Sequence, residues 1–124
     1  SVYSQAWPSK PIKLVVTFAP GGGADFVGRA IGAKLTESLG QPVVVDNRAG
    51  GNTTIATLAA AKSPPDGHTL LLTDNSFVMA AGLYPRLPFD PQKDFSQISA
   101  IAESPSIMIA RAELPALSRR GAYS

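Results

Sequence analysis

The chain has 124 residues, of which 44% are hydrophobic and 16% charged, a composition typical of one globular domain and not of a disordered segment. It contains no cysteine, which excludes disulfides, thiolate nucleophiles and cysteine-based metal sites. Eleven Lys and Arg residues oppose nine acidic residues, and without Arg119 and Arg120 near the end the two signs balance. A neutral body without clustered cations gives little support to binding of nucleic acids or anionic membranes.

The first predicted element is a strand at Ile12–Phe18, which is short, rich in β-branched residues and almost continuously apolar. This pattern is typical of a strand buried on both faces of a parallel sheet. Ala19–Gly23 interrupts it. A helix is predicted from Asp25 to Leu39, because apolar residues recur there at three- and four-residue spacing. Asp25 is a natural N-cap for this helix, and Gly40 a natural stop.

The alternation of strand and helix continues along the chain. The next predicted elements are a strand at Pro42–Asp46, a helix capped by Asn52 or Thr53 and running to about Lys62, a strand at Thr69–Thr73 and a helix at Phe77–Leu83. This order predicts an α/β fold: a mostly parallel sheet with right-handed crossovers and helices on both faces. We expect the first three strands in the spatial order 2-1-3.

A loop and two further strands are predicted after these elements. Tyr84–Phe95 carries three prolines and is expected to be an ordered surface loop. Ile98–Ala102 and Ile107–Ala110 have the apolar pattern of strands. Leu117–Ser124 has no periodicity, and we expect this tail to be disordered.

The segment Phe18–Asp25, with the sequence FAPGGGAD, joins a buried strand to the beginning of a helix. Its glycines let the backbone approach a ligand closely. The first amides of a helix are unpaired and the helix dipole adds positive potential, so such a loop suits a carboxylate or a phosphate. A tight turn with close helix–strand packing explains the glycines equally well, and both interpretations stay open. The spacing is that of neither a dinucleotide-binding motif nor a P-loop.

Two further loops, Ala49–Thr53 and Asp74–Ser76, are expected at the same edge of the sheet. They supply neutral hydrogen-bond donors, which suits an anionic or amide-bearing small molecule. Helix capping explains Asn75 and Ser76 at least as well as contact with a ligand does.

Catalysis and metal binding have little support in the sequence. The only histidine, His68, lies in a turn before a strand and is expected to be exposed. No serine lies in a G-x-S-x-G elbow. Asp25, Asp46 and Asp74 could meet at the strand ends and hold a metal, but capping and turn roles explain them more simply. We predict no catalytic residue and no metal site.

Several strings, taken together, resemble the Bug or TctC-like substrate-binding proteins of tripartite tricarboxylate transporters. They are, in the order of that family, WPSKPIKLVVTFAPGGGADFVGR, LGQPVVVDNRAGGN, SPPDGHTLLLTDNS and LYPRLPFDPQKDF. The resemblance covers about Trp7 to Ala116. It implies a periplasmic-binding-protein-like fold, in which two lobes close on a small organic acid that is handed to membrane transporter subunits.

The resemblance also implies a ligand and its place. The ligand is expected to be a di- or tricarboxylate, an acidic amino acid or an aromatic acid, and no cofactor is expected. Three loops, matching Phe18–Asp25, Gly50–Asn52 and Asp74–Ser76, would border the cleft mostly through their main chain. The predicted ligand-binding residues are Phe18, Ala19, Pro20, Gly21, Gly22, Gly23, Ala24, Asp25, Gly51, Asn52, Asp74, Asn75 and Ser76.

Members of that family are roughly twice this length or more, so we expect a truncated first lobe. Residues 1–10 would be the segment left after signal-peptide cleavage into the periplasm, residues 11–116 the partial lobe, and residues 117–124 a divergent tail. A single lobe is expected to bind at millimolar affinity at best, and its exposed edge invites self-association.

Three functions stay open from the sequence. The leading one is a solute-binding receptor that captures an organic carboxylate. The second is a remnant that folds but no longer binds, because half of the cleft is missing. The third, an enzyme domain of flavodoxin-like or nucleotide-binding type, requires a catalytic constellation that we do not find.

Overall fold

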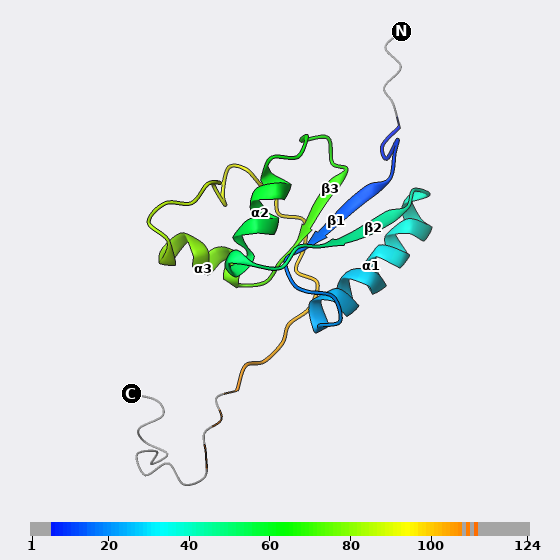
Figure 1. Cartoon of the computed structure of the whole chain (residues 1–124). Helices are drawn as coiled ribbons and strands as arrows, with labels where there is room; N and C mark the ends of the chain where they lie inside the picture. Colours follow the sequence, from blue (N-terminus) through cyan, green and yellow to red (C-terminus); the bar gives the residue numbers. More distant parts are fainter. Residues whose placement is uncertain (1–5, 108, 110, 112–124) are drawn as a thin grey trace.

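The computed structural model describes residues 6–107, 109 and 111. Its elements are, in chain order, β1 (Ile12–Val16), α1 (Gly23–Leu39), β2 (Val43–Asn47), the 3₁₀ helix η1 (Gly51–Thr53), α2 (Thr54–Ala61), β3 (Thr69–Leu72) and α3 (Ser76–Leu83) (Figure 1). The predicted alternation is confirmed, with boundaries displaced by one or two residues. No helix in this part of the chain combines the length and hydropathy that a bilayer crossing needs.

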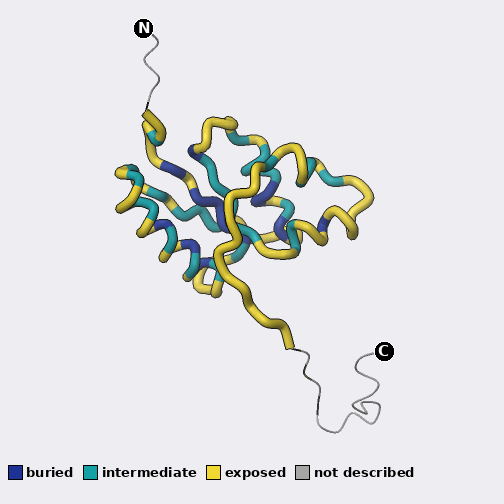
Figure 2. Tube along the Cα trace, turned by 180° about the vertical axis from the view of Figure 1, so that it is seen from behind, coloured by how far each residue is buried: buried dark blue, intermediate teal, exposed yellow. Residues whose placement is uncertain are grey.

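The three strands form one parallel sheet in the order β2-β1-β3, as predicted. Strand β1 is central, because Leu14 pairs with Val45 of β2 on one side and with Leu70 of β3 on the other. Since β1 has a neighbour at each edge and helices pack on the sheet, it is the most buried strand, and Ile12 and Val16 have no exposed surface. Figure 2 shows this strand as a nearly continuous buried stretch.

Helices α1 and α2 cover opposite faces of the sheet. Side chains alternate between the two faces along a strand. A Cβ atom on Gly28 of α1 would lie 3.1 Å from Val16 Cγ2, so α1 covers the face that carries Leu14 and Val16. Val15 points to the other face and is only 2% exposed, because α2 packs against β1 and β3 there. The domain therefore has the three expected layers.

The end of α1 is fixed to the beginning of β2. Gly40 takes a left-handed conformation, with φ 73°, and its amide donates to the Thr36 carbonyl, so the predicted stop is confirmed. The Thr36 hydroxyl donates to the Gly32 carbonyl at 2.8 Å and accepts the amide of Val43 at 3.0 Å. These bonds set where the returning strand begins.

The proline-rich segment Tyr84–Phe95 is a loop, as predicted, and three aromatic rings hold it against α3. Phe77 of α3 stacks on Phe89 with 6.3 Å between ring centroids and meets Phe95 edge-on at 5.3 Å. Phe89 and Phe95 also meet edge-on, at 6.2 Å. Edge-on and stacked pairs at such distances add to the stabilisation from burial alone.

The prediction of two further strands is wrong for the residues described. Ile98–Ala102 belongs to no strand, and neither do Ile107 and Ile109; Met108 and Ala110 lie outside the described residues. A strand leaves its N–H and C=O groups unpaired unless another strand lies beside it. The described part of the chain provides no such neighbour here, and Ile98 is 82% exposed. The predicted tail, residues 117–124, lies outside the described residues.

The prediction that His68 is exposed is also wrong, because the N-terminal segment covers it. His68 is 8% exposed, and the ring of Trp7 lies 6.0 Å from its ring. The Ser9 amide donates to His68 Nε2 at 3.2 Å, and Lys10 pairs with Asp66 at 3.0 Å. The amide of His68, followed by Lys10, lowers the pKa of Asp66 to about 2. The turn residue is therefore part of a small polar cluster.

Candidate functional site

Only one of the three successive glycines after β1 has a backbone conformation that requires glycine. Gly21 has φ +90°, whereas Gly22, the N-cap of α1, has φ −87° and ψ 175°, which any residue adopts. A Cβ atom on Gly22 would lie 3.8 Å from the Ala19 carbonyl oxygen, an ordinary contact. A Cβ atom on Gly23 would meet nothing within 4 Å. Neither the turn nor the packing therefore requires glycine at positions 22 and 23.

The amides at the beginning of α1 are unpaired, as predicted. The helix begins at Gly23, so its first amides have no carbonyl one turn earlier to donate to. Within α1, Phe26 is the first residue whose amide is paired, with the Gly22 carbonyl at 3.0 Å. Among the described residues, the amides of Gly22 to Asp25 have no acceptor. They lie at the positive end of the helix dipole.

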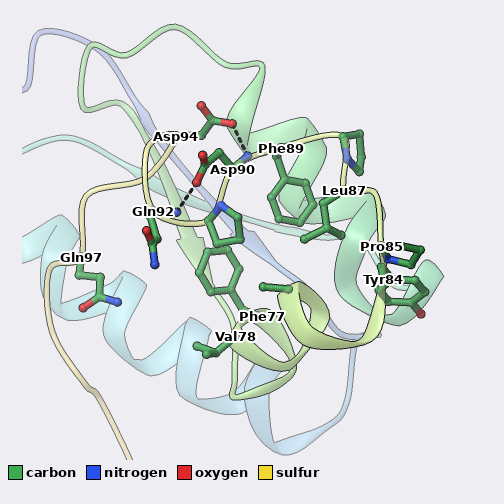
Figure 3. A pocket seen from close by; sticks show the side chains of 13 residues that line it. Phe77, Val78, Tyr84, Pro85, Leu87, Phe89, Asp90, Gln92, Asp94 and Gln97 are labelled. Atoms are coloured by element: carbon green, nitrogen blue, oxygen red, sulfur yellow. Dashed lines mark hydrogen bonds between the residues drawn. The ribbon is translucent and has the colours of Figure 1, made fainter.

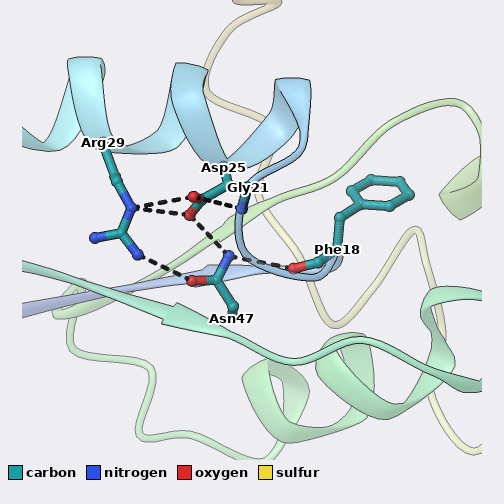
Figure 4. Close-up of polar contacts among 5 residues, drawn as sticks. All are labelled: Phe18, Gly21, Asp25, Arg29 and Asn47. Carbon is teal, nitrogen blue, oxygen red and sulfur yellow. Dashed lines mark hydrogen bonds and ion pairs between the residues drawn. The ribbon is translucent and has the colours of Figure 1, made fainter.

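Asp25 is the third residue of α1 and not its N-cap, which corrects the prediction. Its carboxylate folds back and accepts the amide of Gly21 at 3.0 Å (Figure 4). Arg29 Nε donates to both carboxylate oxygens at 3.1 Å, and Asn47 Nδ2 donates at 3.0 Å. Asn47 Nδ2 also donates to the Phe18 carbonyl at 3.2 Å. The carboxylate therefore joins the glycine loop, α1 and the end of β2.

These donors hold the pKa of Asp25 below its usual value of 3.8, the amide of Gly21 contributing most and then Arg29 and Asn47. The Asp25 side chain is 9% exposed and that of Arg29 59%. A charged carboxylate thus lies beneath the loop, with its cationic partner on the surface. The sequence interpretation missed Arg29 and Asn47. The available signal was the spacing of Asp25 and Arg29, one helical turn apart, which is typical of an ion pair.

The second and third predicted loops contact each other. Ser76 Oγ lies 3.4 Å from Thr53 Oγ1, at hydrogen-bond distance. Asn52 and Thr53 have positive φ values, 49° and 71°, which non-glycine residues rarely adopt. Thr53 occupies the N-cap position of α2, but its side chain makes no capping bond. Gly51, with φ +57°, precedes these two residues.

Asp74 stabilises the third loop locally. Its carboxylate accepts both the amide of Ser76, at 2.9 Å, and the Ser76 hydroxyl. Asn75 is the N-cap residue of α3, but its side chain makes no capping hydrogen bond. Helix capping therefore does not explain why an asparagine side chain stands at this position. Asp74 and Asn75 are exposed.

The first and third loops are neighbours through their parent strands. The amide of Thr17 donates to the Leu72 carbonyl at 3.2 Å, so the loops that follow leave the sheet side by side, at the edge formed by the carboxyl ends of the strands. No hydrogen bond joins Phe18–Asp25 to Asp74–Ser76 among the described residues. The hydroxyls of Thr17 and Thr73 are buried beside this edge, and neither has a hydrogen-bond partner in the described structure.

Two surface hollows differ in what they could accept. A hollow of about 470 Å³ beside the glycine loop is lined by Gly21, Gly22, Asp25, Phe26, Arg29 and Ala30. It is bordered by α1 rather than by the third loop. A larger hollow, of about 830 Å³, lies between α3 and the proline-rich loop (Figure 3). Its lining includes Asp90 and Asp94 and contains no Lys, Arg or His, so it is poorly suited to an organic anion.

The three aspartates considered for a metal site each bond to other residues, Asp74 to Ser76 as described above. Asp25 is held by Gly21, Arg29 and Asn47, and Asp46 pairs with Arg48 at 3.0 Å. The residues described contain no group of three or more potential metal ligands.

Comparison with known proteins gives a consistent result. Residues 27–120 match the family described as "Tripartite tricarboxylate transporter family receptor". The chain is 40% identical over 115 residues to the protein BugT of Bordetella pertussis, covering 91% of this chain and 35% of BugT.

Solved structures share this fold over part of their length. The periplasmic binding protein BugD matches with a TM-score of 0.68 and 37% identity over 72% of this chain and 30% of BugD. MatC from Rhodopseudomonas palustris with bound malate matches with a TM-score of 0.65 and 39% identity, over 72% of this chain and 31% of MatC. The chain spans about a third of the length of these proteins.

Proposed function

Because the chain belongs to the tripartite tricarboxylate transporter receptor family, we propose that it forms the carboxylate-binding first lobe of a periplasmic solute receptor. Members of this family are receptors and not enzymes, in agreement with the absence of a catalytic pattern in the sequence. The proposal concerns what the lobe binds, where it binds it, and what it then associates with.

The observation that carries the proposal is the open space at Gly22 and Gly23. Glycine is a poor helix former, by about 1 kcal/mol relative to alanine in a helix interior. Gly23 begins α1 although neither its φ nor any neighbour excludes a side chain. A ligand that approaches the backbone closely explains both glycines, since a Cβ atom would separate it from the unpaired amides.

The ligand that fits these amides is an anion, and the family indicates a carboxylate. MatC, which shares this fold, was solved with malate. We propose that a small organic acid lies against the first loop and is bordered by the other two. The residues proposed to contact it are Phe18, Ala19, Pro20, Gly21, Gly22, Gly23, Ala24, Asp25, Gly51, Asn52, Asp74, Asn75 and Ser76.

A single lobe limits the affinity. Sites of this kind normally enclose most of the ligand's surface, whereas one lobe leaves it half exposed. Charge-assisted hydrogen bonds that compete with water contribute about 1.5–3 kcal/mol each. A half-exposed carboxylate that accepts two or three such bonds gains roughly 3–9 kcal/mol, and immobilising it costs about 4 kcal/mol or more. The surplus corresponds to about millimolar affinity at best. If even this binding is lost, the chain is the non-binding remnant that the sequence left open.

Nuclear magnetic resonance titration of the ¹⁵N-labelled chain with malate tests the proposal. We expect saturable shifts of the Gly22 to Asp25 amides at millimolar malate. Gly23→Ala should keep the fold and weaken these shifts, because its Cβ atom occupies the space of the ligand. Gly82→Ala is the matched control, since a Cβ atom there also meets nothing within 4 Å and Gly82 lies in the last turn of α3, at the opposite end of that helix from Ser76. A wild-type chain without saturable shifts would favour the remnant.

We further propose that the complete receptor delivers its ligand to membrane transporter subunits, and that this lobe self-associates when it stands alone. The support for self-association is exposed apolar surface: Val44 on the sheet is 55% exposed, and Val78 and Leu83 of α3 are 66% and 62% exposed. In the described part of the chain, no further strand pairs with β2 or β3 at the two edges of the sheet. Light scattering of the purified chain tests the proposed self-association, and a monodisperse monomer would contradict it.

A further inference from the structure

Asp25 presents an electrostatic problem for a loop that binds anions. Its carboxylate is charged at neutral pH and bonded to the amide of Gly21, directly before the unpaired amides of α1. A negative charge in the first turn stabilises the helix itself. The same charge repels any second anion that approaches those amides.

In the described part of the chain, one cationic residue pairs with this carboxylate. Arg29 Nε lies 3.1 Å from both carboxylate oxygens of Asp25, and Arg29 Nη2 lies 3.4 Å from Asn47 Oδ1. Asn47 donates to the same carboxylate but is neutral. The other arginine near this edge, Arg48, is paired with Asp46 at 3.0 Å.

The remaining charge at this edge makes the balance sensitive. Asp74, in the third loop, forms no ion pair in the part of the chain that the structure describes. Two arginines therefore oppose three aspartates around the loops. Without the charge of Arg29, the carboxylates of Asp25 and Asp74 would both be uncompensated beside the loops that are proposed to bind an anion.

We propose that Arg29 is a positioning residue for carboxylate binding: it neutralises Asp25, so that the amides of Gly22 to Asp25 can accept a second anion, without touching the ligand itself. This inference rests on the proposed function. It explains why the pair is asymmetric. The carboxylate is buried where it holds the loop through Gly21, while the Arg29 side chain is more than half exposed and lies between α1 and the end of β2 (Figure 4).

A double-mutant cycle on the full chain tests this, with malate as the probe and the amide shifts of the glycine loop as the readout. Arg29→Gln should weaken malate binding roughly fivefold, the effect expected of one uncompensated charge a few ångström away in partly screened surroundings. Arg29→Lys should restore most of the affinity. In an Asp25→Asn background, Arg29→Gln should have little effect, because there is no charge left to neutralise.

Each outcome separates the explanations. If Arg29→Gln weakens binding equally in both backgrounds, the arginine contacts the ligand directly and the inference fails. Equal affinities of wild type and Arg29→Gln also overturn it. Failure of the wild type to bind malate rejects the proposed function instead. If Asp25→Asn does not fold, Arg29→Lys still separates a role of the charge from a role of the side-chain shape, which lysine would not restore, and an unrescued Arg29→Lys overturns the inference.

Discussion

Gly28 of α1 lies so close to Val16 of β1 that a Cβ atom on the glycine would be 3.1 Å from the valine Cγ2. Leu72 of β3 closes the same space, with its Cδ2 at 3.2 Å. Helix α1 therefore lies across β1 and β2, and at Gly28 it also approaches a side chain of β3.

We expect Gly28→Ala to destabilise the domain relative to Gly32→Ala. At Gly32 a Cβ atom would lie 3.5 Å from Val43 Cγ1, an ordinary contact, so the alanine should gain up to about 1 kcal/mol from helix propensity. At Gly28 the same gain is opposed by overpacking of roughly 1–3 kcal/mol. Urea unfolding of both variants measures the difference, and a more stable Gly28→Ala would show that Val16 and Leu72 repack freely.

Thr17 and Thr57 are both buried, but loss of the hydroxyl group should change the stability of the domain differently at the two positions. Thr17 is 2% exposed and its hydroxyl has no partner in the described structure, whereas the Thr57 hydroxyl donates to the Thr53 carbonyl at 2.8 Å. Replacing an unpaired buried hydroxyl by a methyl group is close to neutral or stabilising, but losing a hydrogen bond costs about 1 kcal/mol. Thermal unfolding should give a higher melting temperature for Thr17→Val than for Thr57→Val.

The same two variants also test whether the Thr17 hydroxyl has a hydrogen-bond partner in solution. If Thr17→Val is as destabilising as Thr57→Val, the Thr17 hydroxyl has a bonding partner in solution, such as a buried water molecule shared with Thr73.

Acid should destabilise the domain partly through Asp66. Its folded-state pKa of about 2 lies below the ordinary value of 3.8, so its contribution to stability is present above pH 3.8 and is lost as the pH falls toward 2. Asp66→Asn keeps an oxygen for the His68 amide but removes the charge opposite Lys10. Stability measured between pH 7 and pH 2 should therefore fall less steeply for Asp66→Asn than for the wild type. Parallel curves would contradict the assignment.

The aromatic cluster should account for the order of the proline-rich loop. Phe89 is 7% exposed and contacts both Phe77 and Phe95, so Phe89→Ala should cost about 3–5 kcal/mol. Phe26, which is 74% exposed, is the matched control, and its replacement by alanine should change the stability little. Chemical denaturation compares them, and equal effects would show that the ring cluster contributes nothing specific.

The sequence predicts the fold well where hydrophobic period and chain order determine it. Three short β-branched runs separated by amphipathic helices leave few arrangements. If the crossovers are right-handed and the two helices cover opposite faces, the order is β2-β1-β3. The same pattern misled at Ile98–Ala102, because an apolar run indicates a strand only where a neighbouring strand completes its hydrogen bonds. Pattern alone contains no information about that neighbour.

The candidate site is predictable in part for a related reason. The glycine loop is visible in the sequence, since its residues are contiguous. Arg29 and Asn47 escape notice because their role depends on distances across the α1–β2 connection. His68 escapes for the same reason, since Trp7 covers it from 61 positions away in the chain. Local sequence shows which backbone can bind, but not which distant side chains hold it in place.

The hydroxyl of Thr36, which serves both α1 and β2, has a consequence for how the domain opens. The amide of Val43 begins a strand and would be expected to fray, yet its acceptor is a helix side chain that is itself bonded to Gly32. We therefore expect this amide to exchange with solvent mainly when the helix end and the strand end separate together. Hydrogen exchange at Val43 should follow the cooperative opening of the whole β1–α1–β2 unit, so that the glycine loop moves with the sheet as one rigid body.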